Sequence, residues 1–256
     1  MRVAALYDIH GNLPALEAVL AEVEAAAPDL VVIGGDVASG PCPGDVLDRL
    51  ERLGDRAAWV MGNADRELVA LYDAGTRPED LEYPVARLDA WCAQRLTRAQ
   101  RDRLAACEPV VRVEVAGLGG VLFCHGSPRG DTEIITAVSP PQRLEPMLAG
   151  VAEPVVVCGH THHQFDRDVA GRRVLNAGSV GMPYEDAAAA YWLWLGPEAE
   201  LRRTDYDIAA AAERMRAGGL PGVDELVLRE SLLEPVGSAF VARHFEQLAT
   251  ASPDAP

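Results

Sequence analysis

An acid and a histidine stand two positions apart where the first apolar run of the chain ends. The run Val3–Tyr7 leads directly into Asp8 and His10. Because a β-strand alternates its side chains, a strand that ends here directs an oxygen ligand and a nitrogen ligand to one spot. Asn12 can then cap a helix whose apolar residues recur at helical spacing. This pair alone fits ordinary loop residues equally well, so the interpretation depends on whether the pattern recurs.

The pattern recurs twice in the next fifty residues. The β-branched run Leu30–Ile33 is followed by Asp36, and the short apolar run Ala57–Met61 is followed by Asn63 and Asp65. Each polar end precedes a stretch of helix formers. Three parallel strands joined by helical crossovers form a βαβαβ layer, and such sheets bind ligands beyond the carboxyl ends of their strands. We therefore expect the three polar ends to face one crevice.

Two later strands are predicted to end in histidines. A hairpin over residues 110–124 leads into His125, and the apolar strand Pro154–Cys158 leads into His160 and His162. The glycine spacing between the early strands and helices does not match a dinucleotide-binding fingerprint. The chain thus repeats strand ends with metal-capable side chains rather than a nucleotide-binding loop.

The rest of the chain supplies packing elements and one open question. Residues 66–108 are rich in helix formers and are predicted to form two or three helices, which either cap the crevice or only pack on its rim. The turn-prone run 176–181 is a further candidate for ligand contact. The other predicted elements are helix 141–148, strands 165–169, 172–175, 190–195 and 201–206, helices 207–217 and 236–248, and a frayed tail over 249–256.

Length and composition favour one domain with one sizeable core. The 256 residues are 49% hydrophobic, and no linker rich in proline, glycine or serine divides them. We expect a single domain over residues 1–256, with a helical insertion at about 66–108 and a helical extension from about residue 207. The longest apolar run, Ala187–Leu195, is too short to span a bilayer, and the first residues lack a signal-like segment.

Charge and cysteine content limit the compartment and the partners. Five cysteines without paired spacing indicate free thiols and a reducing compartment, so we expect a cytoplasmic protein. A formal net charge of −16 argues against broad nucleic-acid binding and against binding to anionic membranes, because both require basic surface. A phosphate-bearing substrate would need a local reversal of charge, which bound cations provide.

The candidate ligands suit first-row divalent metals. Five of the six histidines directly follow apolar strands, and carboxylates or an amide stand at the other strand ends. Imidazole, carboxylate and amide ligands without cysteine favour manganese, iron, nickel or zinc over a closed structural zinc site. More than four candidate ligands in one crevice indicate two metal ions.

These motifs together resemble those of the calcineurin-like metallophosphoesterases, including the small prokaryotic phosphodiesterase-type members. The resemblance covers roughly the first four fifths of the chain, and the motifs occur in the family's order. It implies an α/β fold, a four-layer α/β/β/α sandwich of two facing mixed sheets. The matching motifs are Asp8-x-His10, Gly35-Asp36, Gly62-Asn63 with Asp65, His125, and Gly159-His160-x-His162.

The resemblance also implies a ligand set. Asp8, His10 and His162 would hold one metal, while Asn63, His125 and His160 would hold the other, and Asp36 would bridge the two. Residues expected to take part in catalysis are Asp36, Asn63, Asp65, His125 and Arg129.

The expected activity is that of a dinuclear metal-dependent phosphoesterase, in particular a phosphodiesterase acting on a small phosphate ester. Two metals about 3.5 to 4 Å apart clamp a phosphoryl oxygen and yield a bridging hydroxide that attacks phosphorus in line. Alternatives within the superfamily are a phosphomonoesterase, a protein phosphatase and a dinucleoside-polyphosphate hydrolase. A non-catalytic scaffold is also known in the superfamily, but scaffolds can lose ligands and this chain retains the full set.

Several residues keep a second interpretation. Asn63 could cap a helix, and His125 could be a hydrogen-bonded core histidine. His163 fits an exposed neighbour or a second-shell residue better than a ligand. Arg129 fits a phosphate contact and an exposed loop residue equally well. The family often has a proton-donating histidine after Gly-Asn, but this chain has Ala64, so acid catalysis is the least certain part of the expected mechanism.

Overall fold

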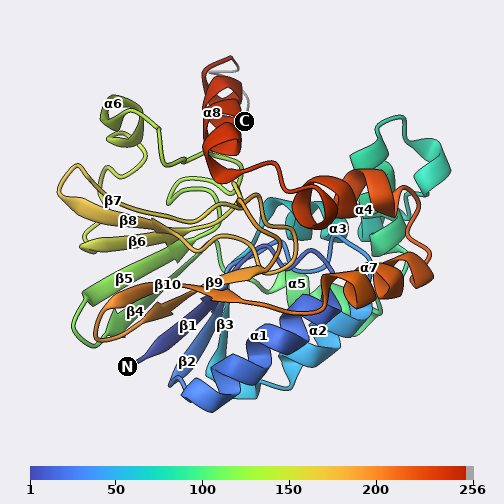
Figure 1. Cartoon of the computed structure of the whole chain (residues 1–256), viewed down its shortest axis with the longest axis horizontal. Coiled ribbons are helices and arrows are strands. Elements are labelled where there is room, and N and C mark those ends of the chain that lie inside the picture. The colour runs from blue at the N-terminus through green and yellow to red at the C-terminus, as the bar shows by residue number, and fades with distance from the viewer. Residues whose placement is uncertain (252–256) are drawn as a thin grey trace.

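Strand β1 (Val3–Leu6) lies at the centre of the first of two five-stranded mixed sheets (Figure 1). The computed structural model describes residues 1–251 of the chain. β1 pairs in parallel with β2, which pairs in parallel with β3, as the sequence predicts. On its other side β1 pairs antiparallel with β9 from the far end of the chain. The order is β10 (Ala199–Thr204), β9 (Ala190–Leu195), β1, β2 (Leu30–Ile33) and β3 (Ala57–Trp59).

The second sheet is built from the hairpin and the strands that follow it. β5 and β6 are parallel, and so are β6 and β8, while both edge pairs are antiparallel. The order across the sheet is β4 (Val110–Val115), β5 (Gly119–Cys124), β6 (Val155–Cys158), β8 (Arg172–Asn176) and β7 (Phe165–Val169).

Apolar side chains fill the space between the two sheets. Val3, Ala5 and Tyr7 of the first sheet pack in one buried cluster with Phe123 and Val157 of the second. The alternate residues of β1, Ala4 and Leu6, lie on the opposite face of the sheet and pack in the cluster that includes the helices. The near-continuous hydrophobic strands of the sequence are explained by this burial on both faces.

Helices cover the outer face of the first sheet (Figure 1). The side chain of Asn12 caps α1, accepting a hydrogen bond from Ala15 N as the sequence predicts. The α-helices of this layer are α1 (Leu13–Ala26), α2 (Pro43–Glu51), α3 (Asn63–Ala74), α4 (Pro84–Ala93), α5 (Arg98–Ala105) and α7 (Ile208–Ala217), with 3₁₀ turns η1 (Gly54–Arg56) and η2 (Pro78–Asp80).

The fourth layer is mostly irregular chain. Residues 134–151 cover the outer face of the second sheet with apolar side chains such as Leu144 and Leu148. The expected helix over 141–148 is shorter, because regular α-helix is confined to α6 (Pro141–Leu144). The four-layer architecture is therefore present, with a thin outer layer on this side.

The C-terminal region differs most from the sequence-based expectation. β10 begins and ends two residues earlier than predicted, and a π-helical segment, η3 (Asp224–Leu233), was not predicted at all. The last helix, α8 (Ser238–Ala251), extends into the expected tail, so the prediction of fraying was wrong for residues 249–251. The remainder of that tail, 252–256, lies outside the described residues. In the part of the chain that the structure describes, no helix has the length and apolar character needed to cross a membrane.

Candidate metal centre

Two groups of metal-capable side chains lie side by side at the carboxyl ends of the strands. Within each group the candidate ligand atoms lie within 4.8 Å of one another. Asp36 Oδ2 is 3.3 Å from His125 Nε2 and 3.8 Å from His10 Nε2, so it lies between the groups. The first cluster consists of Asp8, His10 and His162, and the second cluster of Asp36, His125 and His160.

Strand alternation is not what brings Asp8 and His10 together. β1 ends at Leu6, and both residues adopt left-handed backbone conformations in the loop that follows. The expectation that strand alternation aligns the two side chains was therefore wrong, although they do meet, with His10 Nε2 3.9 Å from Asp8 Oδ1. The left-handed candidate ligands and their φ angles are Asp8 (52°), His10 (44°), Asp36 (52°), His160 (65°) and His162 (55°). For a residue with a Cβ this costs roughly 1–2 kcal/mol.

Backbone hydrogen bonds between the loops hold these conformations. The loop after β1 lies along the loop after β2, with His10 N donating to Asp36 O at 2.9 Å and Asp8 N donating to Gly35 O at 3.1 Å. The approach is close: a Cβ at Gly62 would stand 2.2 Å from Asp36 Oδ1. The surrounding chain thus fixes the positions of the candidate ligands.

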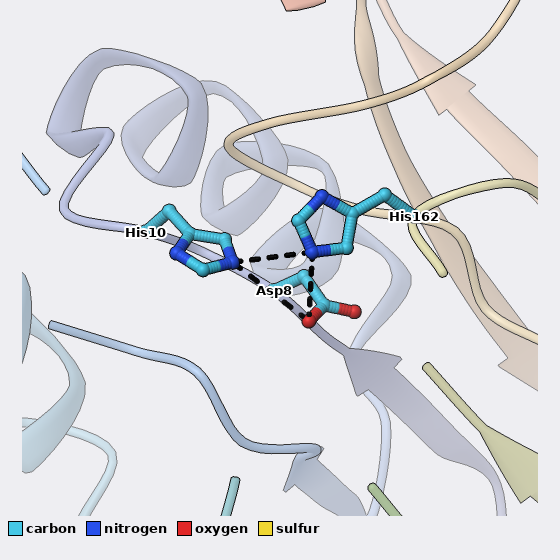
Figure 2. Close-up of side chains that lie close together, drawn as sticks. All are labelled: Asp8, His10 and His162. Carbon is cyan, nitrogen blue, oxygen red and sulfur yellow. Dashed lines mark hydrogen bonds and ion pairs between the residues drawn. The ribbon is translucent and has the colours of Figure 1, made fainter. Parts of the chain in front are cut away.

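Each histidine of the first cluster is oriented by a main-chain carbonyl. His10 Nδ1 lies 3.0 Å from Ser39 O, and His162 Nδ1 lies 2.7 Å from Met182 O. A carbonyl only accepts, so each Nδ1 carries the hydrogen and each Nε2 presents a lone pair. Figure 2 shows these Nε2 atoms directed at each other and at Asp8. The Nε2 atoms of His10 and His162 are 3.2 Å apart. Two facing lone pairs repel each other, so this contact favours a cation or a shared proton between them.

In the second cluster, His125 is also oriented by a main-chain carbonyl. His125 Nδ1 lies 2.9 Å from Gly34 O, which leaves Nε2 directed at Asp36. His125 is therefore not a fully hydrogen-bonded core histidine. Asn63 adjoins this cluster, because the N–H of the next residue, Ala64, donates to Asp36 Oδ1 at 2.8 Å. Asn63 does not cap α3, since Gly62 occupies the N-cap position.

Three buried polar atoms in this centre have no hydrogen-bond partner among the described residues. They are Asp8 Oδ1, Asn63 Oδ1 and His125 Nε2. Leaving such atoms unpaired costs about 1–3 kcal/mol each. All three belong to the predicted ligand set, and oxygen and imidazole nitrogen are the donors that divalent metals accept. The residues therefore fit a pair of metal ions.

Buried carboxylates make the centre favourable for positive charge. Burial alone would lower the pKa of His125, but Asp36 and Asp8 raise it to about 10. Burial would likewise raise the pKa of Asp36, yet His125 and His10 hold it below its ordinary value. Burial, with the neighbouring His125, lowers the pKa of His160 to about 4. The buried negative charge thus favours a cation in this site, and a metal ion bound there would displace the proton that His125 otherwise holds.

Asp65 lies beneath the centre rather than in it. Its Oδ1 accepts a hydrogen bond from Val37 N at 2.9 Å, and its Oδ2 accepts one from Gly62 N at 3.3 Å. These N–H groups belong to the loop that carries Asp36 and to the loop that follows β3. Burial, together with Asp36, raises the pKa of Asp65 to about 7. The contacts assign Asp65 to loop positioning.

Arg129 is at the surface, with its side chain 49% exposed and paired with Glu133. It lines a cavity of about 340 Å³ together with Arg66, which is paired with Asp131 at 2.7 Å. In the sequence, Arg66 comes shortly after Asn63 and Arg129 comes shortly after His125. This placement keeps open the two interpretations of Arg129 given by the sequence.

His163 lies in neither cluster. It is buried, with Nδ1 3.0 Å from Thr161 O and Nε2 accepting from Ala137 N at 3.4 Å. It is thus not the exposed neighbour that the sequence allowed. Both ring nitrogens have partners, and through them His163 links the loop after β6 to Ala137.

Several supporting residues were not found from the sequence. Tyr184 stacks on His162 with ring centroids 5.0 Å apart, and the carbonyls of Ser39 and Met182 carry no side-chain signal. The run 176–181 was identified as a possible ligand contact. In the structure, Ser179 Oγ instead donates to the main-chain oxygen of Asp8 at 2.7 Å. It therefore supports the backbone of a candidate ligand.

Comparison with known protein families gives a match over most of the chain. The model of the calcineurin-like phosphoesterase superfamily domain matches residues 1–194. The chain belongs to this superfamily. Phosphoesterases are hydrolases of phosphate esters, so the expected family, fold and enzyme class are confirmed.

Two solved structures and one curated group illustrate the similarity. A metallophosphoesterase from Sphaerobacter thermophilus is 27% identical, with a TM-score of 0.66 over 86% of this chain and 95% of that one. A hypothetical protein from Pyrococcus horikoshii OT3 shares the fold, with 20% identity, a TM-score of 0.76, and coverage of 90% and 97%. The symmetrical bis(5'-nucleosyl)-tetraphosphatase of Yersinia pestis (strain Pestoides F) is 31% identical over 150 residues, 58% of this chain. The chain spans about half the length of the curated relatives it matches.

Proposed function

We propose that this chain is a dinuclear metal-dependent phosphodiesterase that acts on small phosphate esters. The observation that carries the proposal is the pair of adjacent clusters, in which histidine nitrogens face Asp8 and Asp36 while buried oxygens of Asp8 and Asn63 have no hydrogen-bond partner. Superfamily membership supports phosphate-ester hydrolysis. Five free cysteines support a cytoplasmic location.

Seven residues would hold the metals: Asp8, His10 and His162 at one position, Asn63, His125 and His160 at the other, and Asp36 at both. When bound, two divalent ions of manganese, iron, nickel or zinc would supply Lewis acidity and a nucleophilic water at neutral pH. The protein contributes preorganisation. The carbonyls of Ser39, Gly34 and Met182 fix a proton on Nδ1 of His10, His125 and His162 respectively, so that Nε2 is directed at the site.

The leaving group would depart without an obvious protein acid beside Asn63. Ala64 occupies the position where many family members have histidine, and its methyl group carries no proton. His163 is buried with both nitrogens bonded, which argues against it as a substitute. We therefore expect a preference for substrates whose leaving groups are stable as anions, such as aryl phosphodiesters.

Hydrolysis of dinucleoside polyphosphates is a second candidate. The similarity to symmetrical bis(5'-nucleosyl)-tetraphosphatases over 150 residues favours it. A polyphosphate leaving group is itself a stable anion, so this chemistry also tolerates alanine at position 64. The short coverage of those relatives makes it the second choice rather than the first.

One experiment tests the proposal and separates the two candidates. Purified protein is stripped with chelator, reloaded with manganese, and analysed for metal content and for hydrolysis of bis(p-nitrophenyl) phosphate, p-nitrophenyl phosphate and diadenosine tetraphosphate. We expect about two metal equivalents and fastest turnover of the diester. Turnover that survives complete metal removal would contradict the proposed function. Faster turnover of the tetraphosphate than of the diester would favour the second candidate.

A further inference from the structure

Helix α4 of the inserted segment contacts the loop that follows Asp36. Asp89 and Cys92 lie three positions apart and therefore on one face of the helix. Ser39 Oγ donates to Asp89 Oδ1 at 2.5 Å. Cys92 Sγ lies 3.3 Å from both Gly40 N and Gly40 O. The helix thus fixes two successive residues of the loop.

The same two loop residues contact His10. The carbonyl of Ser39 accepts from His10 Nδ1 at 3.0 Å, and Gly40 lies so near that a Cβ there would stand 1.8 Å from His10 O. A displacement of Ser39 would therefore turn or release the imidazole. The contacts form an unbroken path from Asp89 through Ser39 to a candidate metal ligand.

Packing alone does not explain an acid at position 89. Asp89 is 2% exposed, and the apolar residues close to it in the sequence of α4, Leu88, Trp91 and Cys92, are buried as well. Burial raises its pKa to about 7, which means that its charged form is disfavoured there. An apolar residue of similar size would be favoured on stability grounds. Buried acids kept at such a cost are commonly tied to a functional site.

We propose that Asp89 is a positioning residue, which holds the Ser39 carbonyl in place and thereby directs His10 Nε2 at the first cluster. The inference rests on the proposed function, since it assigns a role toward the same metal centre. It also answers the question left by the sequence about residues 66–108. Through α4 this segment does more than pack, because it orients a candidate ligand.

The test measures manganese binding rather than turnover. Apo protein is titrated with Mn²⁺ by calorimetry, and each variant is compared by thermal unfolding. Ser39→Ala removes the hydroxyl but keeps the carbonyl, while Asp89→Ala removes the acceptor. Asp89→Asn keeps an oxygen acceptor. Gln100→Ala is the matched control, because Gln100 is a buried polar residue of the same insertion that bonds Gly44 and Asp48, away from the loop.

We expect Asp89→Ala and Ser39→Ala to weaken one of the two manganese equivalents by about 10 to 100-fold. Asp89→Asn should stay within about threefold of the wild type, and Gln100→Ala should lower stability without changing either affinity. Background variants assign the affected position. Asp89→Ala should weaken the equivalent that remains in His125→Ala, and should leave unchanged the one that remains in His162→Ala.

Three outcomes would overturn the inference. These are unchanged affinity in Asp89→Ala, a loss in Asp89→Ala no greater than in Gln100→Ala, and a loss in Asp89→Asn equal to that in Asp89→Ala. Wild-type protein that binds no manganese would contradict the proposed function itself. The two failures are therefore distinguishable.

Discussion

The two candidate clusters lie side by side but are supported by different parts of the molecule. In the second cluster His125 Nδ1 is hydrogen-bonded to the carbonyl of Gly34, directly after β2. Asp36 accepts a hydrogen bond from Ala64 N in the first turn of α3. In the first cluster His10 depends on Ser39, which α4 holds. His162 stacks on Tyr184, which α8 contacts through Phe245 with ring centroids 6.3 Å apart.

This difference separates a half of the centre that the sheets support from a half that packed helices support. The supports of the second cluster are sheet ends and the loops that join them directly to helices. The supports of the first cluster include packed helices, and α8 lies beyond the segment that matches the family model. Changes in helix packing are therefore expected to act on the metal position that we propose for Asp8, His10 and His162.

The largest effect is expected at the residue that the two halves share. Asp36→Asn should abolish turnover while the fold survives, because a bridging carboxylate both holds two cations and offsets their repulsion. Steady-state kinetics and circular dichroism measure the two properties. Retention of more than roughly a tenth of wild-type kcat, a loss of only about 1.4 kcal/mol, would show that Asp36 is not the bridge.

Removing one ligand from either half should remove one metal. His125→Ala and His10→Ala should each reduce the manganese content from about two equivalents to about one, since each loses an imidazole ligand from a different position. Elemental analysis after equilibrium dialysis gives the stoichiometry. If the wild type binds a single equivalent and His125→Ala binds the same amount, the division into two metal positions is wrong.

A smaller gain is expected from restoring a proton donor beside the second cluster. Ala64→His should speed hydrolysis of substrates with poor leaving groups by about tenfold, a fraction of the 10² to 10⁴-fold that an optimally placed acid contributes. Asp65 is its near neighbour in the sequence and can influence the new imidazole. Substituted phenyl phosphodiesters, assayed at saturating manganese, give the dependence of rate on leaving-group pKa.

The slopes of that dependence decide the outcome. We expect a shallower slope for Ala64→His than for the wild type. Equal slopes, with the wild type handling poor leaving groups as well as the variant, would show that another group already supplies the proton.

A further prediction concerns the stability cost of the first cluster's support. The pKa of Asp89 is about 7 in the folded protein because of burial, and its ordinary value is 3.8. Between these values the folded state binds more protons than the unfolded state, so stability decreases as pH rises, by at most about 1.4 kcal/mol per unit. Asp89→Asn carries no such proton. Its stability relative to the wild type should therefore rise from pH 4 to pH 7 and then level off.

Urea unfolding with chelator present measures this difference without metal binding. Gln100→Ala again serves as control and should differ from the wild type by an amount that does not change with pH. A constant difference between Asp89→Asn and the wild type would show that Asp89 is ionised throughout.

Strand ends were the part of this molecule that the sequence predicted well. Asp8, His10, Asp36, His125 and the Gly-His-x-His motif were identified because polar residues interrupt apolar runs, and that contrast is local in sequence. The left-handed backbone of Asp8 and His10 was not predictable in this way, because non-glycine residues adopt it only when the surrounding chain enforces it.

Supports at a distance were the part that was missed. In the sequence, Asp89 is one acid in a predicted helical segment, and Tyr184 is one aromatic residue in a predicted loop. Their roles depend on contacts with Ser39 and His162, which single-sequence periodicity does not encode. The π-helical segment 224–233 was missed for a related reason, since its hydrogen-bond spacing differs from the periodicity used to find helices.

The position of β9 has a consequence for the order of folding. β9 pairs with β1 in the middle of the first sheet, yet it follows β1 by nearly the whole length of the matched domain. During synthesis β1 and β2 emerge early, but one edge of β1 stays unpaired until β9 has been made. His10 and His162 are likewise separated by 152 positions in the sequence. Non-local pairing of this kind slows folding and leaves strand edges exposed meanwhile. The first cluster therefore cannot be complete until His162 has been synthesised.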